Sequence, residues 1–122
     1  MAYQEVLHAI DGATATTTSS EINIEDAKKI TIVCKRSNHS AGSTAFSVTV
    51  SPDGTNYTTY NKLINNLANS NVQDLTRSAS ITLSSDTVTF VSLDCCDAFK
   101  TMKVTATETT DGTHDAWVII QR

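Results

Sequence analysis

The segment 44–60 joins two stretches of strand-like sequence through a tight turn, and it constrains the fold more than any other part of the chain. Phe46, Val48 and Val50 share one face at a period of two, and the residues between them are polar. This pattern is typical of a strand that packs on one side and meets water on the other. We therefore expect a β-hairpin whose second arm runs toward Ile64.

Turn chemistry of one kind recurs along the chain. Pro52 sets φ for a reversal, Asp53 can accept hydrogen bonds from the backbone ahead of it, and Gly54 tolerates a positive φ. Asp111 and Gly112 separate two further alternating stretches in the same way, which predicts a second hairpin near the end of the chain.

Short alternating stretches recur roughly every ten residues, and no segment keeps a 3.6-residue period beyond a turn or two. This predicts an all-β fold, a single antiparallel β-sandwich or jelly-roll-like domain over 1–122 with short hairpins and little or no helix. Residues 1–20 form either a peripheral strand and loop or a strand exchanged with a neighbouring subunit. The expected strands are 3–10, 29–36, 44–50, 57–64, 72–75, 78–83, 87–93, 99–107 and 116–120, with a polar strand or loop at 13–20, a brief alternation at 21–24 and the longest loop at 65–71.

The last expected strand has large apolar side chains on both faces. Ala116, Val118 and Ile120 share one face, whereas Trp117 and Ile119 share the other. Two interpretations stay open: a central strand with both faces covered inside the domain, or an outer face that contacts another subunit.

Charge and hydropathy exclude two classes of partner. Nine basic and thirteen acidic residues give a net charge of −4, and the basic residues are scattered, so we expect no nucleic-acid partner. No apolar run approaches the roughly 18 residues of a membrane span, and the start of the chain lacks the basic and apolar regions of a signal peptide, so we expect no membrane partner and synthesis in the cytoplasm.

We find no pattern of a catalytic or metal site. The G-x-S-x-G frame of a serine hydrolase is missing, and His8, His39 and His114 are dispersed without metal-chelating spacing, so each is expected on the surface. The turn residues at 53–56 and 94–97 offer oxygen ligands for calcium, although acidic residues are ordinary in turns. We expect no enzymatic activity, no cofactor and no metal.

The three cysteines do not form a recognisable framework. Cys34, Cys95 and Cys96 are odd in number and lack C-x-x-C spacing, which disfavours both a disulfide scaffold and a zinc site. Cys34 shares parity with apolar neighbours and is expected in the core. A bridge from Cys34 to either of the other two is the alternative.

The order of these pieces resembles small virion structural proteins of tailed bacteriophages. The resemblance covers about residues 29–121 and rests on the turn V-S-P-D-G-T-N-Y at 50–57, the strand F-K-T-M-K-V-T-A-T at 99–107 and the alternating strand that follows. It implies assembly rather than catalysis. A capsid decoration (cement) protein is the favoured role, with a tail-tube or tail-tip subunit as the alternative.

The same resemblance implies partners and a location. The chain would associate with itself and with a major capsid or tail protein, and it would reside in the virion after synthesis in the host cytoplasm. Tyr3, Leu7, Trp117 and Ile119 are the candidate contact residues.

Two other functions remain open. A carbohydrate-binding module would stack sugar rings on aromatic side chains, for which Tyr57, Tyr60 and Trp117 are the candidates. An extracellular filament subunit would donate its N-terminal strand to a neighbour.

Overall fold

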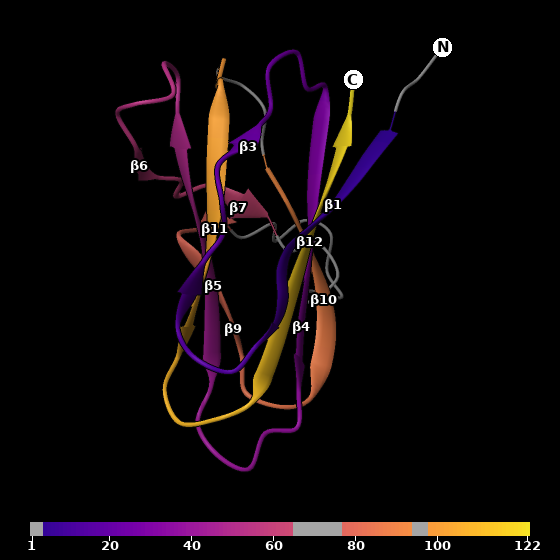
Figure 1. Cartoon of the computed structure of the whole chain (residues 1–122), viewed down its shortest axis with the longest axis vertical. Helices are drawn as coiled ribbons and strands as arrows, with labels where there is room; N and C mark the ends of the chain where they lie inside the picture. Colours follow the sequence, from indigo (N-terminus) through magenta and orange to yellow (C-terminus); the bar gives the residue numbers. More distant parts are fainter. Residues whose placement is uncertain (1–3, 65–76, 94–97) are drawn as a thin grey trace.

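The computed structural model describes residues 4–64, 77–93 and 98–122, and within them it is all-β. Two antiparallel sheets pack face to face, which confirms the predicted β-sandwich (Figure 1). No helix that could cross a membrane occurs in these residues.

The first sheet has six strands. In spatial order they are β1 (Gln4–Ala13), β12 (Thr113–Gln121), β4 (Lys29–Ser37), β10 (Thr87–Ser92), β7 (Leu63–Ile64) and β8 (Arg77–Ser78). Its long strands β1, β12, β4 and β10 lie on the right in Figure 1.

The second sheet is built around two long strands, β5 (Thr44–Ser51) and β11 (Thr101–Glu108), on the left in Figure 1. Four short strands pair with them. These are β2 (Thr17–Thr18) and β3 (Ile22–Asn23) on β11, and β6 (Thr58–Thr59) and β9 (Ser80–Leu83) on β5.

Alternate residues of the long strands fill the space between the sheets. Because successive side chains of a strand point to opposite faces, each strand contributes every second residue. These inward residues are almost inaccessible to solvent and include Ile30, Ile32, Cys34, Phe46, Val48, Val50, Met102, Val104, Ala106, Ala116, Val118 and Ile120. The predicted inward faces of 46–50, 102–106 and 116–120 are therefore confirmed.

The central hairpin is shorter than expected. β6 pairs with β5 only at Thr49–Thr59 and Val50–Thr58, and the chain then crosses to the first sheet as β7. A continuous second arm to Ile64 was therefore wrong. The period of two shows which side chains are buried. It does not show to which sheet a strand belongs, because both sheets bury side chains against the same core.

The expected hairpin at Asp111 and Gly112 is also wrong. β11 belongs to the second sheet and β12 to the first, so the turn between them is an arch from one sheet to the other. The arch packs on the loop between β4 and β5, because the Asp111 carboxylate accepts hydrogen bonds from the backbone N–H groups of Ser40 (2.8 Å) and Ala41 (3.2 Å). Both connections lie at the lower end of the sandwich in Figure 1.

The N-terminal strand pairs within its own chain. β1 is the edge strand of the first sheet beside β12, and its register shifts between His8 and Ile10 and again between Ile10 and Ala13. Of residues 13–20, Ala13 ends β1 and 17–18 form the short strand β2.

The expected strand 78–83 divides into β8 and β9, which lie in different sheets. The loop and strand predicted at 65–71 and 72–75 lie outside the described residues, as do Cys95 and Cys96.

Candidate functional site

The outward side of the first sheet carries a row of large side chains across four strands. The strand register places His8 of β1 opposite Trp117 of β12, Trp117 opposite Val33 of β4, and Val33 opposite Phe90 of β10. Directly opposed residues of neighbouring strands lie on the same face and touch. Phe90 is 46% exposed, which is unusual for a phenylalanine.

Rows on either side extend this surface. Val6 lies opposite Ile119, on one side of the central row, and is 58% exposed. Val88 lies on the other side and is 50% exposed. We call this surface the outer face, and it comprises Val6, Val33, Val88, Phe90, Trp117 and Ile119.

An apolar surface of this kind favours a contact with another macromolecule. Contiguous exposed apolar side chains mark interaction sites, because covering apolar surface recovers about 25 cal/mol of hydrophobic free energy per Å². Aromatic residues such as Phe90 and Trp117 are also enriched in the cores of protein interfaces.

The ring of Trp117 is not a free platform. The imidazole of His8 stacks on it with ring centroids 4.5 Å apart and planes 9° from parallel. One face of the indole is therefore covered by the neighbouring strand. A sugar ring, which needs a flat exposed aromatic face, finds that side occupied.

His8 also marks the polar border of the outer face. Its Nε2 atom lies 3.1 Å from Oδ1 of Asp115, and its Nδ1 atom lies 3.7 Å from Oδ1 of Asp11. The N–H of Gly12 donates to the same Asp115 oxygen at 2.7 Å. Residues of the two strands β1 and β12 thus converge at this border, although Asp115 is more than a hundred residues from β1.

The structure separates the four contact candidates. Trp117 and Ile119 lie on the outer face, whereas Leu7 points inward and packs against the core. Tyr3 lies outside the described part of the chain. Sequence analysis missed Val33 and Phe90, although each stands in an alternating stretch. The signal that identifies them is the register that aligns them with Trp117.

The three sugar-stacking candidates do not meet. Tyr60 is 4% exposed and packs edge-on against Phe99 in the core, with ring centroids 6.0 Å apart. Tyr57 precedes β6 and packs beside β11 of the second sheet: its hydroxyl lies 2.8 Å from Oγ1 of Thr101, and the ammonium of Lys103 lies 4.5 Å from its ring. Trp117 belongs to the other sheet.

Two buried polar side chains close the lower end of the sandwich. Arg36 and His114 are opposite one another in β4 and β12 and are 1% and 0% exposed, so the expectation of a surface position for His114 was wrong. Nε2 of His114 lies 2.8 Å from the carbonyl oxygen of Ala15, while Nδ1 has no partner among the described residues. The guanidinium of Arg36 is engaged by backbone carbonyls, so this pair serves the fold.

The turn at Pro52, Asp53 and Gly54 is satisfied internally. The Asp53 carboxylate accepts the N–H groups of Thr55 and Asn56, both at 2.8 Å. These bonds lower the pKa of Asp53 well below its usual range. Gly54 adopts a φ of 82°, as the turn requires. The carboxylate oxygens of Asp53, which the sequence offered for calcium, are thus engaged by the turn itself.

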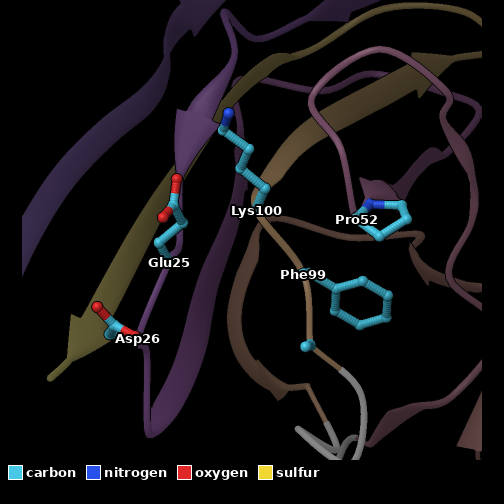
Figure 2. A pocket seen from close by; sticks show the side chains of 6 residues that line it. Glu25, Asp26, Pro52, Phe99 and Lys100 are labelled. Atoms are coloured by element: carbon cyan, nitrogen blue, oxygen red, sulfur yellow. The ribbon is translucent and has the colours of Figure 1, made fainter.

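A hollow of about 330 Å³ opens where the upper loops meet. Figure 2 shows Glu25 and Asp26 on one side of the segment that carries Phe99 and Lys100, just before β11, and Pro52 on the other. The hollow thus has two acidic groups, Glu25 and Asp26, and one basic group, Lys100, among its lining residues. One wall of the hollow is Ala98, the neighbour of residues 94–97, which lie outside the described ranges. The outer face consists of described residues alone, so we take it as the candidate site.

Fold and surface together define a two-sheet antiparallel β-sandwich with one exposed apolar sheet face. Its fold is similar to that of the SPBc2 prophage-derived protein YomS, with a TM-score of 0.71 at 15% sequence identity over 100% of this chain and 96% of that one. A structure of PirA superposes at a TM-score of 0.45, with 7% identity over 99% and 93% of the two chains. No protein-family model and no curated protein matches the chain. At these identities the likeness to YomS is one of fold.

Proposed function

We propose that this protein is a non-enzymatic structural protein of a bacteriophage particle, and specifically a capsid decoration (cement) protein. The observation that carries the proposal is the outer face, an apolar surface spread over four strands of a sheet in which Phe90 stays 46% exposed. An exposed apolar sheet face is suited to docking on another protein surface.

Two further observations support a phage role. YomS, which shares the fold over nearly the whole of both chains, is described as a prophage-derived protein. The motifs at 50–57 and 99–107 resemble those of small virion proteins, and in the structure they form the turn after β5 and the strand β11 that pairs with it.

The proposed partners are a second copy of the chain and a major capsid protein, and the proposed location is the virion after synthesis in the host cytoplasm. We expect neither a nucleic acid nor a membrane to bind, since the chain carries a net charge of −4. Sugar binding is less well supported, because Tyr60 is buried and His8 covers one side of Trp117.

The test combines solution mass with particle binding. Wild-type protein is compared with Phe90→Asp and Ile119→Asp, which place a charge on the outer face. Thr107→Asp is the matched control, because Thr107 is an exposed strand residue of the second sheet. Light scattering from about 1 to 200 µM resolves dissociation constants in the micromolar range, and a tighter complex stays associated throughout. Co-sedimentation with phage heads and, separately, with tails then identifies the partner.

We expect wild type and Thr107→Asp to self-associate or co-sediment with heads, and both outer-face variants to lose these contacts with unchanged circular dichroism. Co-sedimentation with tails alone would replace the cement role by that of a tail subunit. A wild-type protein that stays monomeric and binds neither part would overturn the proposal. A loss of β structure in Phe90→Asp or Ile119→Asp would contradict the placement of these side chains on a docking surface.

A further inference from the structure

At the β1 border of the outer face, one imidazole lies between two carboxylates. His8 Nε2 is 3.1 Å from Asp115 Oδ1, and His8 Nδ1 is 3.7 Å from Asp11 Oδ1. One potential ligand atom from each of the three side chains lies within 4.8 Å of the other two. A small ion is therefore within reach of all three after minor side-chain rotation.

The backbone irregularity of β1 assembles this cluster. In a regular strand, residues three apart point to opposite faces and lie about 10 Å apart. His8 and Asp11 instead approach to 3.7 Å, because the register of β1 shifts between His8 and Ile10 and again before Ala13. The side chain of Asp115 arrives from the neighbouring strand β12.

The charge of the cluster is compensated only in part, since Lys35 of β4 lies opposite Asp115 in the register but beyond ion-pair distance. Among the described residues, His8 is the ion-pair partner of both Asp11 and Asp115, and neither carboxylate is within ion-pair distance of a lysine or arginine. With a neutral imidazole, the cluster holds two negative charges next to a nitrogen donor. A divalent cation would neutralise both charges and accept the nitrogen lone pair.

We propose that His8, Asp11 and Asp115 form a binding site for a divalent transition-metal ion of the zinc class. One imidazole nitrogen and two carboxylate oxygens are ligands that such ions take, and three protein ligands leave a coordination position open for water. The side chains of Asp115, His8 and Asp11 are 14%, 34% and 82% exposed, so the ion would be reached from solvent and its open position would face outward.

Contacts around the ligands restrict two of them. The N–H of Gly12 holds Oδ1 of Asp115 at 2.7 Å, and the indole of Trp117 holds the imidazole plane of His8 by stacking. Such outer contacts orient ligands and strengthen metal binding. The site is complete in one chain, so it does not depend on the proposed docking function and can exist if that function fails.

The stacking also supplies a readout, since Trp117 is the one tryptophan of the chain. The experiment uses full-length, tag-free protein that has been treated with a chelator and dialysed at pH 7.5. Zn²⁺ is titrated by calorimetry, and Trp117 emission is followed in parallel. Variants are His8→Gln and Asp115→Asn. His39→Gln is the matched control, because His39 pairs with the single carboxylate of Asp86.

We expect one Zn²⁺ per chain with a Kd of about 1–100 µM and a change in Trp117 emission that saturates at the same ratio. Both ligand variants should weaken binding at least about tenfold, which is the usual loss when a metal site is disturbed. His39→Gln should bind as wild type does.

Two results would overturn the site: a wild-type chain that takes up no stoichiometric Zn²⁺ at about 1 mM, a concentration above that of any useful site, or a His8→Gln protein that binds it unchanged. Circular dichroism of each variant confirms that the fold is retained, so that a lost titration reports lost ligands. The docking test uses metal-free buffers and reads mass rather than Zn²⁺, so the two proposals fail separately.

Discussion

The guanidinium of Arg36 donates a hydrogen bond of 2.8 Å to the backbone carbonyl oxygen of Asp111, 75 residues further along the chain. The same group donates to the carbonyls of Ala41 and Gly42, at 2.8 and 3.0 Å. One buried side chain of β4 therefore connects the loop after its own strand with the arch that leads from β11 to β12. It closes the lower end of the sandwich, where both connections pass from one sheet to the other.

Replacing Arg36 with alanine should cost about 3–5 kcal/mol of unfolding free energy, because several buried carbonyls lose their donor. Arg36→Lys should recover only part of the lost stability, because the ammonium of lysine lacks the planar fork with which the guanidinium reaches several carbonyls at once. Urea unfolding followed by circular dichroism measures the change. Lys35→Ala, one position along the same strand on the outward side, should change stability by no more than about 0.5 kcal/mol. Equal losses in Arg36→Ala and Lys35→Ala would contradict the role of Arg36.

Gly42 and Gly12 offer a matched pair of left-handed glycines. Both have positive φ, 76° and 61°, but a Cβ atom at Gly42 would come within 2.5 Å of Oγ1 of Thr110, whereas one at Gly12 would meet nothing within 4 Å. Gly12→Ala should therefore cost the conformational strain alone, about 1–2 kcal/mol. Gly42→Ala should cost about 2–4 kcal/mol, because the loop must also move away from the arch. Thermal unfolding of the two variants compares them, and a larger loss in Gly12→Ala would show that the loop and arch are not in close contact.

Stability should decrease in acid through two turn carboxylates. Hydrogen bonds from Ser40 and Ala41 lower the pKa of Asp111 to about 2, and those from Asn56 and Thr55 lower the pKa of Asp53. Because both folded-state pKa values lie below the unfolded value of about 3.9, the stabilisation is fully present above pH 4 and is lost as the pH falls toward 2.

Urea unfolding at pH 6, 4, 3 and 2 tests this dependence. Asp111→Asn should be less stable than wild type at pH 6, and its stability should fall less between pH 4 and 2. Glu25→Gln, an exposed carboxylate outside both turns, should keep the wild-type slope. A wild-type slope in Asp111→Asn would show that the contacts with Ser40 and Ala41 do not favour the charged form.

Cys34 should resist thiol-specific reagents in the folded protein. It is 1% exposed, and burial raises the pKa of its thiol to about 12, so hardly any thiolate is present at pH 8. The Cys95→Ser/Cys96→Ser variant leaves Cys34 as the one thiol. This variant should release no thiol signal with a disulfide reagent in native buffer and one equivalent in 6 M guanidinium. Rapid native labelling would place Cys34 outside the core.

Sequence periodicity predicted which side chains are buried better than which strands are neighbours. The alternation of Phe46, Val48 and Val50 identified the inward face of β5, and that of β12 was equally clear. A period of two describes one strand at a time, however, and both sheets face the same core. For this reason the connection at Asp111 and Gly112 predicted a hairpin where the chain makes an arch.

The outer face could be predicted only in part. Trp117 stood out because it is large and alternates with an apolar inward face, whereas Phe90 and Val33 become partners of Trp117 only through the strand order β12-β4-β10. The same limit applies to His8 and Asp115, which approach one another through the pairing of the first and last strands. The spacing of His8 and Asp115 along the sequence does not indicate that they are close in space.

The order of strands also bears on how the protein is synthesised. β11 and β12 are the last strands along the chain, yet each is an interior strand, β11 between β2 and β5 and β12 between β1 and β4. β1 has no neighbour to pair with until residues 113–121 have left the ribosome, and β5 lacks its longest partner until residues 101–108 have done so. β4 can pair earlier with β10, and β5 with β6 and β9, but β1 and one edge each of β4 and β5 stay unpaired until the last two strands emerge. We expect folding to follow translation, as is common for sheets built from distant segments, and we expect chaperones to improve the yield.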